Sequence, residues 1–382
     1  MYIFDFLPAQ LYHYIYTLGI FSLCLIVVFI YLPLNNNNRI TSIKTVDQIG
    51  AILIILLLIL FIGLRPISGF FGDMGLYSYT YNNFDSTFEE NMSQNGEWLF
   101  IWIIKTCKSF NFEDRIYFLV IAAIYFFFMA MTCWRLMRNN TYVAILFCVI
   151  SFSCFTYGVN GIRNGMATSI MMYALSFLKS DNKWVLILSL LIMFISISIH
   201  KSMMLPAVCA LVAYFFIKEP KYAIIFWIAS IFISFIAGDY VTQFLVNLGF
   251  DDRMEKYANI DSIEDETTGV AGGLVSGFRI DFIIYSIMPI IMAWYITVKR
   301  NFKDKMFNII ATTYILANAF WIMVIRSEQS NRFAYLSWFL YPIVIAYPLL
   351  RMNIWEDQDR KLGLILLAYS GFTVFMEFVY YG

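Results

Sequence analysis

The sequence predicts an all-α, polytopic integral membrane protein, and three observations support this fold class. Hydrophobic residues make up 61% of the 382 positions and charged residues only 14%, whereas soluble domains are roughly 45–50% apolar and about 25% charged. The mean hydropathy is +0.71. Apolar runs near the length of about 20 residues that a spanning helix needs recur along the whole chain. The composition excludes a soluble enzyme, a coiled coil and a disordered chain.

Twelve apolar runs predict about 12 transmembrane helices, within a range of about 11–14, in a single transmembrane domain over residues 1–382. The runs cover residues 12–33, 48–64, 115–134, 141–158, 162–178, 184–199, 202–217, 222–245, 280–298, 306–325, 332–350 and 362–380. Some runs are short, which implies tilted helices or a locally thinned bilayer. The stretch 97–110 is either a half-helix or an interfacial helix, because Trp98 and Trp102 suit the headgroup level.

The distribution of basic residues predicts the orientation of these helices. If residues 34–47 lie inside, six short inside loops carry 15 of the 26 basic residues, whereas 19 of the 26 acidic residues lie outside. Because short cytoplasmic loops are rich in lysine and arginine, we expect both termini outside. This orientation places two long segments, 65–114 and 246–279, on the extracytoplasmic side. Long loops in compact proteins are usually functional or disordered.

The overall charge and the few metal-binding side chains exclude several partners. The formal net charge is zero, and no basic tail or stripe predicts binding to nucleic acid. The chain has two histidines, six scattered cysteines and neither a CxxC nor an HExxH motif. We therefore expect neither a protein-built metal site nor a cofactor. The first apolar run is expected to be a retained helix rather than a signal peptide.

Residues 161–170, GIRNGMATSI, form the sharpest local motif. Arg163 and Asn164 open an apolar helix, and Gly161 with Gly165 makes a GxxxG pattern that allows close approach of a neighbouring backbone. Because a helix N-terminus and an arginine both attract anions, Arg163 is a candidate phosphate ligand. The alternative is a boundary arginine that reaches to the lipid headgroups.

His200 lies at the outside end of one predicted helix and directly before the next. An unperturbed imidazole titrates near neutral pH, which suits a general base. Alternatively, His200 is an interfacial residue that bonds a helix end. His13 lies in an aromatic interfacial stretch, YHYIY, and is a weaker candidate.

Other charged residues also gather at the predicted outside ends of helices, where a charge beside a span marks a candidate functional site. Arg326 and Arg332 bracket the turn RSEQSNR, which Tyr335 follows, and Glu328 could pair with either arginine. Arg279 precedes the helix after the second long segment.

The segment GLRPISGFFGDMGLYSYTYNN, residues 63–83, carries Arg65, Asp73 and Tyr77 on an irregular backbone, and Glu97 follows it. Such a backbone is allowed at membrane depth beside protein or a wet cavity. Its carboxylate and tyrosines suit sugar hydroxyls, and a plain extracellular loop is the alternative.

These segments, in this order, resemble the EpsG-like branch of the Wzy-type polysaccharide polymerases. The matching segments, which span residues 63 to 345, are GLRPISGFFGDMGLYSYTYNNF with Glu97 after it, GIRNGMATSI, SIHKSMMLPA, RMEKYANI, GFRIDFIIYSIMPI and SNRFAYLSWFLYPI. Members of this family commonly have glutamine where Asn164 stands, so the amide is kept on a shorter side chain.

The resemblance implies a GT-C-like glycosyltransferase in the bacterial cytoplasmic (inner) membrane, with its active face extracytoplasmic. Such enzymes join repeat units carried on undecaprenyl diphosphate into capsule, exopolysaccharide or O-antigen, and they need no metal or nucleotide sugar. The resemblance also implies a chain-length regulator and a flippase as partners.

The chemistry of that reaction assigns roles to the candidate residues. A departing diphosphate needs fixed cations where no metal is present, and the predicted cations are Arg163, Arg332, Arg279 and Arg326. The acceptor hydroxyl needs a general base, and the candidates are His200, Asp73 and Glu97. Further predicted substrate contacts are Arg65, Tyr77, Asn164 and Tyr335.

Four other functions remain open at this point. An O-antigen ligase would use the same donor and similar arginine and histidine chemistry. A transporter of lipid-linked sugars would need charges at the membrane midplane and internal repeats, whereas the charges here gather at one face. A metal-dependent transferase would need acidic ligands in the first outside segment, where Asp73 and Glu97 lie. A purely structural subunit is the fourth alternative.

Overall fold

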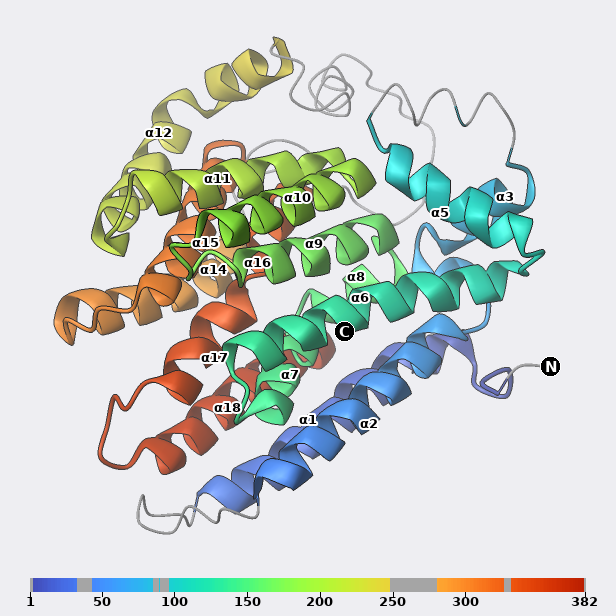
Figure 1. The fold of residues 1–382 in the computed structure, drawn as a ribbon, viewed down its shortest axis with the longest axis horizontal. Coiled ribbons are helices and arrows are strands. Elements are labelled where there is room, and N and C mark those ends of the chain that lie inside the picture. Colours follow the sequence, from blue (N-terminus) through green and yellow to red (C-terminus); the bar gives the residue numbers. More distant parts are fainter. Residues whose placement is uncertain are drawn as a thin grey trace. The chain divides into compact units, whose positions relative to one another are not determined.

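A computed structural model of the chain describes residues 3–32, 43–84, 89, 96–247, 280–325 and 331–380 (Figure 1). Every regular element within these ranges is helical, which confirms the all-α prediction for this part of the chain. Seven helices in it are long and apolar enough to cross a membrane. They cover Ala9–Tyr31, Asp114–Leu136, Pro220–Gly238, Ile280–Lys299, Lys305–Met323, Arg332–Arg351 and Gln358–Tyr380. The protein is therefore a polytopic membrane protein by composition and helix length.

Each of the twelve predicted runs overlaps one or more helices among the described residues, although several runs are not single long helices. The run 141–158 divides into α7 (Thr141–Val149) and α8 (Cys154–Val159). Helix α9 (Ile162–Leu175) has 14 residues, so it is about 21 Å long and shorter than a hydrocarbon core of about 30 Å. A total of about 12 spans and a GT-C-like arrangement stay predictions.

Tertiary contacts divide the chain into two compact units. Unit 1 comprises Met1–Met203 and Ile345–Gly382, and unit 2 comprises Met204–Val344. The remaining helices of unit 1 are η1 (Ala9–Leu11), α1 (Tyr12–Tyr31), α2 (Ile43–Gly63), η3 (Gly69–Phe71), α3 (Met74–Asn82), α5 (Trp98–Ser109), α6 (Asp114–Leu136), α10 (Lys183–Ile199), η4 (Lys201–Met203), α18 (Gln358–Phe375) and η7 (Met376–Tyr380). Helix α17 (Tyr341–Arg351) begins in unit 2 and ends in unit 1.

The helices of unit 1 pack as a series in which α2 contacts α6, α6 contacts α9, and α9 contacts α10 (Figure 1). Helix α10 also contacts α5, and α1 contacts α18. The α2–α6 contact depends on Gly63, because a Cβ at this position would lie 2.7 Å from the Leu119 Cα. The predicted half-helix at 97–110 is α5, whose 12 residues extend over about 18 Å.

Unit 2 is built around α15 (Lys305–Met323), which contacts each of the other major helices of that unit. Those helices are α11 (Met204–Phe215), α12 (Pro220–Asn247), α14 (Ile280–Trp294), which η6 (Tyr295–Lys299) continues, and α16 (Asn331–Trp338). Inside this unit, Trp227 donates a hydrogen bond to Asn318 at 2.7 Å, and Asn318 donates to Ser337 at 3.0 Å. These bonds satisfy polar groups in an apolar interior, where an unpaired group is costly.

Candidate functional site

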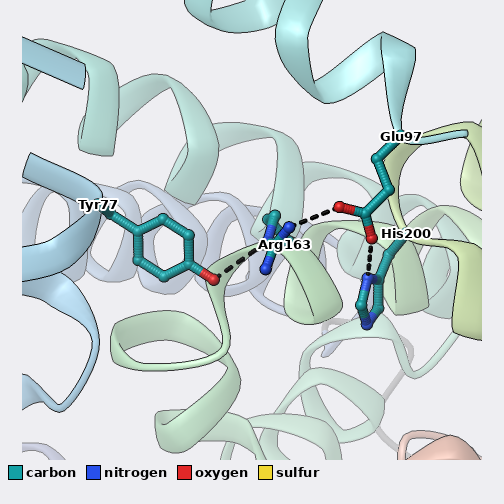
Figure 2. Close-up of polar contacts among 4 residues, drawn as sticks. All are labelled: Tyr77, Glu97, Arg163 and His200. Carbon is teal, nitrogen blue, oxygen red and sulfur yellow. Dashed lines mark hydrogen bonds and ion pairs between the residues drawn. The ribbon is translucent and has the colours of Figure 1, made fainter. Parts of the chain in front are cut away.

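Four side chains from separate segments of unit 1 meet in one polar cluster, the Glu97 cluster (Figure 2). Tyr77 comes from α3, Glu97 directly precedes α5, Arg163 lies in the first turn of α9, and His200 directly follows α10. All four were predicted as site residues, and the topology prediction placed all of them on the outside of the membrane. The structure therefore brings together residues that lie up to 123 positions apart in the sequence.

The carboxylate of Glu97 bridges the two basic members of the cluster. Its Oε2 accepts a hydrogen bond from Nη1 of Arg163 at 2.5 Å, and its Oε1 lies 2.7 Å from Nδ1 of His200 (Figure 2). The exposed fractions of the side chains are 6% for Glu97, 17% for Arg163 and 12% for His200. The cluster is thus nearly excluded from water, where removal of one partner would leave an uncompensated charge.

Aromatic residues complete the surroundings of Arg163. Its Nε donates a hydrogen bond to the Tyr77 hydroxyl at 3.2 Å, and its Cζ lies 5.7 Å from the ring centroids of both Tyr77 and Phe100. Cations within about 6 Å of a ring face are attracted by its quadrupole. The guanidinium is therefore fixed by a carboxylate, a hydroxyl and two rings. The sequence analysis missed Phe100, which follows Glu97 by three positions.

The backbone around Arg163 depends on a glycine. A Cβ at Gly165 would lie 2.5 Å from the carbonyl oxygen of Tyr157, so only glycine lets α8 turn this closely onto α9. The other member of the predicted GxxxG pattern differs, because a Cβ at Gly161 would meet only the Cβ of Asn164 at 3.8 Å. The close approach thus occurs at Gly165 and not at Gly161, and it joins consecutive short helices.

Two serines in the apolar helix α10 hold this helix against α9. Ser189 Oγ donates to the carbonyl of Ala174 at 2.8 Å, and Ser196 Oγ donates to the carbonyl of Ala167 at 2.7 Å. Ser196 also accepts, through its carbonyl, the backbone N–H of His200 at 3.1 Å. The serines therefore position His200 beside Arg163. The sequence analysis missed them, although buried serines seven residues apart in an apolar run are a detectable pattern.

Arg65 lies close in sequence to the cluster segments but has different partners. It is 1% exposed, and its guanidinium donates to the carbonyls of Ile62 at 2.5 Å and Val159 at 2.9 Å. Burial lowers the pKa of Arg65 to about 9, so the guanidinium stays charged at neutral pH. The structure thus shows Arg65 joining the end of α2 to the end of α8, and its predicted contact with substrate stays a prediction.

Asp73 and Asn164 flank the cluster in sequence, because Asp73 precedes Tyr77 by four positions and Asn164 directly follows Arg163. Asp73 is exposed at the start of α3, and its backbone N–H donates to Oδ1 of Asn160 at 2.9 Å. Asn160 was not predicted as a site residue. The side-chain oxygen of Asn164 is buried and has no hydrogen-bond partner among the residues that the structure describes, which leaves an acceptor next to Arg163.

The other predicted residues lie elsewhere. Arg332 and Tyr335 belong to α16 of unit 2, where Arg332 is exposed and the ring of Tyr335 packs edge-on against Trp338 at 5.4 Å. Arg279 and Arg326, with Glu328, lie outside the described residues. Within the described ranges, no three histidine, cysteine, aspartate or glutamate side chains gather in a group that could hold a metal ion.

The fold and the cluster together define a class, a polytopic membrane protein with a nearly buried arginine–glutamate–histidine site. The family model described as the EpsG family matches residues 48–382, which is most of the chain. The protein therefore belongs to the EpsG family, as the sequence motifs predicted, and this membership supports a polysaccharide polymerase-type role. No curated protein and no solved structure matches the chain.

Proposed function

We propose that the protein is a polysaccharide polymerase of the outer leaflet of the bacterial inner membrane. It transfers a glycan from undecaprenyl diphosphate to the non-reducing-end hydroxyl of an incoming lipid-linked repeat unit. The observation that carries this proposal is the Glu97 bridge between Arg163 and His200, because it joins a candidate anion ligand to a candidate base. Membership of the EpsG family supports the class of reaction.

His200 is the proposed general base. An ionised carboxylate only accepts hydrogen bonds, so the contact with Glu97 places a proton on Nδ1 of His200. The other ring nitrogen, Nε2, then carries the lone pair that can take the proton of an acceptor hydroxyl. No described residue bonds Nε2. Glu97 would hold the ring in this tautomer and stabilise the imidazolium that forms, as the aspartate of a catalytic triad does.

The bond changes of the proposed step balance without a metal or nucleotide. The bond between the donor sugar carbon and the diphosphate oxygen breaks, and a bond from the same carbon to the acceptor oxygen forms. The acceptor proton moves to His200, and undecaprenyl diphosphate leaves with the bonding electrons. Cations aimed at the departing oxygens would stabilise this charge.

Arg163 alone is a weak match for a diphosphate, because Glu97 offsets its charge. With Glu97 ionised and His200 neutral, these three side chains carry no net charge, whereas the leaving diphosphate carries at least two negative charges. Additional cations are therefore needed. We propose Arg332, Arg279 and Arg326 for this role, with Arg163 contributing orientation and one cation.

The sugar-binding part of the proposal uses residues around the arginine–glutamate–histidine centre of the cluster. Tyr77 presents its hydroxyl to Arg163 and has the ring face that sugars pack against. The unpartnered Asn164 oxygen and the exposed Asp73 can accept bonds from sugar hydroxyls. Tyr335 is a further proposed contact, and Arg65 is proposed to position residues 65–73.

A deletion strain complemented with variants tests the proposed function. His200→Asn should leave single repeat units on the lipid carrier, whereas His13→Asn should restore the glycan ladder of wild type on a gel. His13 is a matched control because it also contacts a glutamate, Glu377, at 2.9 Å. Immunoblots of membranes must show equal protein. Wild-type polymer from His200→Asn would refute the assigned base.

The same experiment separates the alternative functions. If deletion leaves full-length polymer stranded on its lipid carrier, the protein is a ligase of the O-antigen type. If deletion instead makes repeat units accumulate on the cytoplasmic leaflet, the protein is a transporter of lipid-linked oligosaccharide.

A further inference from the structure

A cavity of about 350 Å³ lies in unit 1 at the opposite end of α9 from the Glu97 cluster. Arg163 stands in the first turn of α9 and Ser176 directly after its last turn, so the two places are about 20 Å apart along the helix axis. The volume is within the range of about 300–1,000 Å³ that is typical of small-molecule sites. Its lining residues are Arg135, Leu136, Ser176, Phe177, Lys179, Ser180, Tyr347 and Arg351.

Three cations and a serine hydroxyl line this basic cavity. The cations are Arg135, Lys179 and Arg351, and none of the eight described lining residues is acidic. Ser180 adds a hydroxyl group, whereas the hydroxyl of Ser176 already donates to the carbonyl of Tyr173 at 2.6 Å. The nearby acid Asp181 is exposed and is not a lining residue. The wall thus offers positive charge and hydrogen-bond donors, the combination that recognises phosphate.

Helix ends at the cavity offset only part of this charge. Helix α6 ends at Leu136, α9 at Leu175 and α17 at Arg351, so three C-termini contribute roughly half a negative charge each. Three side-chain cations against about one and a half negative charges leave a surplus of about one and a half positive charges. Compensation of helix dipoles therefore accounts for only half of the charge gathered there.

The wall of the basic cavity is pre-organised. The guanidinium of Arg135 stacks on Phe177, with Cζ 3.8 Å from the ring centroid, and its Nε donates to the carbonyl of Ser176 at 3.4 Å. The end of α17 is tied to the start of α7, because Nδ2 of Asn140 donates to the carbonyl of Leu350 at 3.2 Å. Lys179 and Arg351 are exposed and can turn toward a ligand.

We infer that the basic cavity binds the phosphate of an anionic ligand, either the headgroup of an acidic membrane lipid or a free phosphate. The positive-inside pattern predicts that this end of the helices is cytoplasmic, where anionic lipids attract basic residues beside membrane helices. The inference does not depend on the polymerase proposal, because no residue of the Glu97 cluster lines the cavity.

Thermal unfolding and native mass spectrometry of the purified full-length protein in detergent micelles test this inference. Phosphatidylglycerol, phosphatidylcholine and inorganic phosphate are titrated separately at constant ionic strength. Wild type should gain Tm and retain bound lipid with phosphatidylglycerol but not with phosphatidylcholine, whose headgroup has no net charge. A response to inorganic phosphate alone would identify free phosphate as the ligand instead.

The double variant Lys179→Gln/Arg351→Gln should bind the anionic ligand about thirtyfold more weakly, since each basic residue near the membrane surface contributes about fivefold. Arg360→Gln is the matched control, because Arg360 is exposed near the start of α18 and does not line the cavity. The inference would be overturned if wild type responded neither to phosphatidylglycerol nor to inorganic phosphate. An undiminished response in the double variant, or an equal loss in Arg360→Gln, would overturn it as well.

Discussion

Two histidine–glutamate pairs lie in unit 1, and their surroundings differ. His200 contacts Glu97 through Nδ1 at 2.7 Å, whereas His13 contacts Glu377 through Nε2 at 2.9 Å. Glu97 is shared with Arg163, and its side chain is 6% exposed. The ring of His13 instead stacks on Phe155 with centroids 4.9 Å apart, and its side chain is 34% exposed. A histidine–glutamate pair alone therefore does not define a candidate site. The His200 pair differs from the His13 pair because it has a third, permanently charged partner, Arg163, and because its histidine is more deeply buried.

The largest expected effect separates the two glutamates. Glu97→Gln should lower the polymerisation rate about 10⁴-fold, because the same loss of the carboxylate that orients and stabilises a catalytic histidine has about this effect in a serine protease triad. Glu377→Gln should leave the rate within about twofold. Initial rates with lipid-linked repeat units, measured at equal protein in membrane vesicles, would show this. Similar losses in both variants would remove the distinction between the pairs.

Arg163 should matter for stability as well as for rate. Arg163→Ala leaves Glu97 buried without its cation and should destabilise the protein by about 3–5 kcal/mol. The double variant Arg163→Ala/Glu97→Gln should regain much of this stability but no activity. Thermal unfolding in detergent gives the stability and the vesicle assay gives the rate. An active double variant would show that the ion pair serves the fold alone.

The two glycines of the GxxxG pattern should respond differently to the same change. Gly165→Ala forces a Cβ against the Tyr157 carbonyl, and such overpacking typically costs about 1–3 kcal/mol. Gly161→Ala meets no close neighbour and should cost clearly less. The midpoints of thermal unfolding give the comparison. Equal midpoints for the two variants would contradict the close approach of α8 to α9.

The smallest expected effect comes from the serines of α10. Ser196→Ala removes the bond to Ala167 on α9 and should cost about 1 kcal/mol, with a loss of rate because His200 shifts. Ser198→Ala is the control, since its Oγ bonds back to the carbonyl of Phe194 within α10. Steady-state rates should fall for Ser196→Ala only. Equal rates for both variants would show that this tether does not position His200.

Much of the helical content was predictable because a membrane span must satisfy its own backbone and is therefore helical and apolar. The break between α7 and α8 was not predictable, because residues 150–153 include neither proline nor glycine, the residues that usually indicate the end of a helix. It follows from packing of short helices within unit 1, which a one-dimensional hydropathy profile does not contain. The division into two units is likewise a property of tertiary contacts.

Four members of the predicted site, Tyr77, Glu97, Arg163 and His200, do meet. They were predictable because charges beside apolar runs are rare and costly. The topology prediction also placed them on the same side of the membrane, which limits the region in which they can lie. The pairing pattern was not predictable. Which carboxylate meets His200 depends on how α5 and α10 contact each other, and Glu377 meets His13 from the other end of the chain.

Reconstitution tests the central claim most directly. Purified wild type and His200→Asn are placed in liposomes with a defined repeat unit on undecaprenyl diphosphate, without nucleotide sugar. Polymer length and released undecaprenyl diphosphate are both measured. The account predicts that wild type lengthens the glycan and releases one carrier per bond formed, while His200→Asn does neither. Polymer formation by His200→Asn at the wild-type rate, or the absence of released carrier from an active wild type, would contradict it.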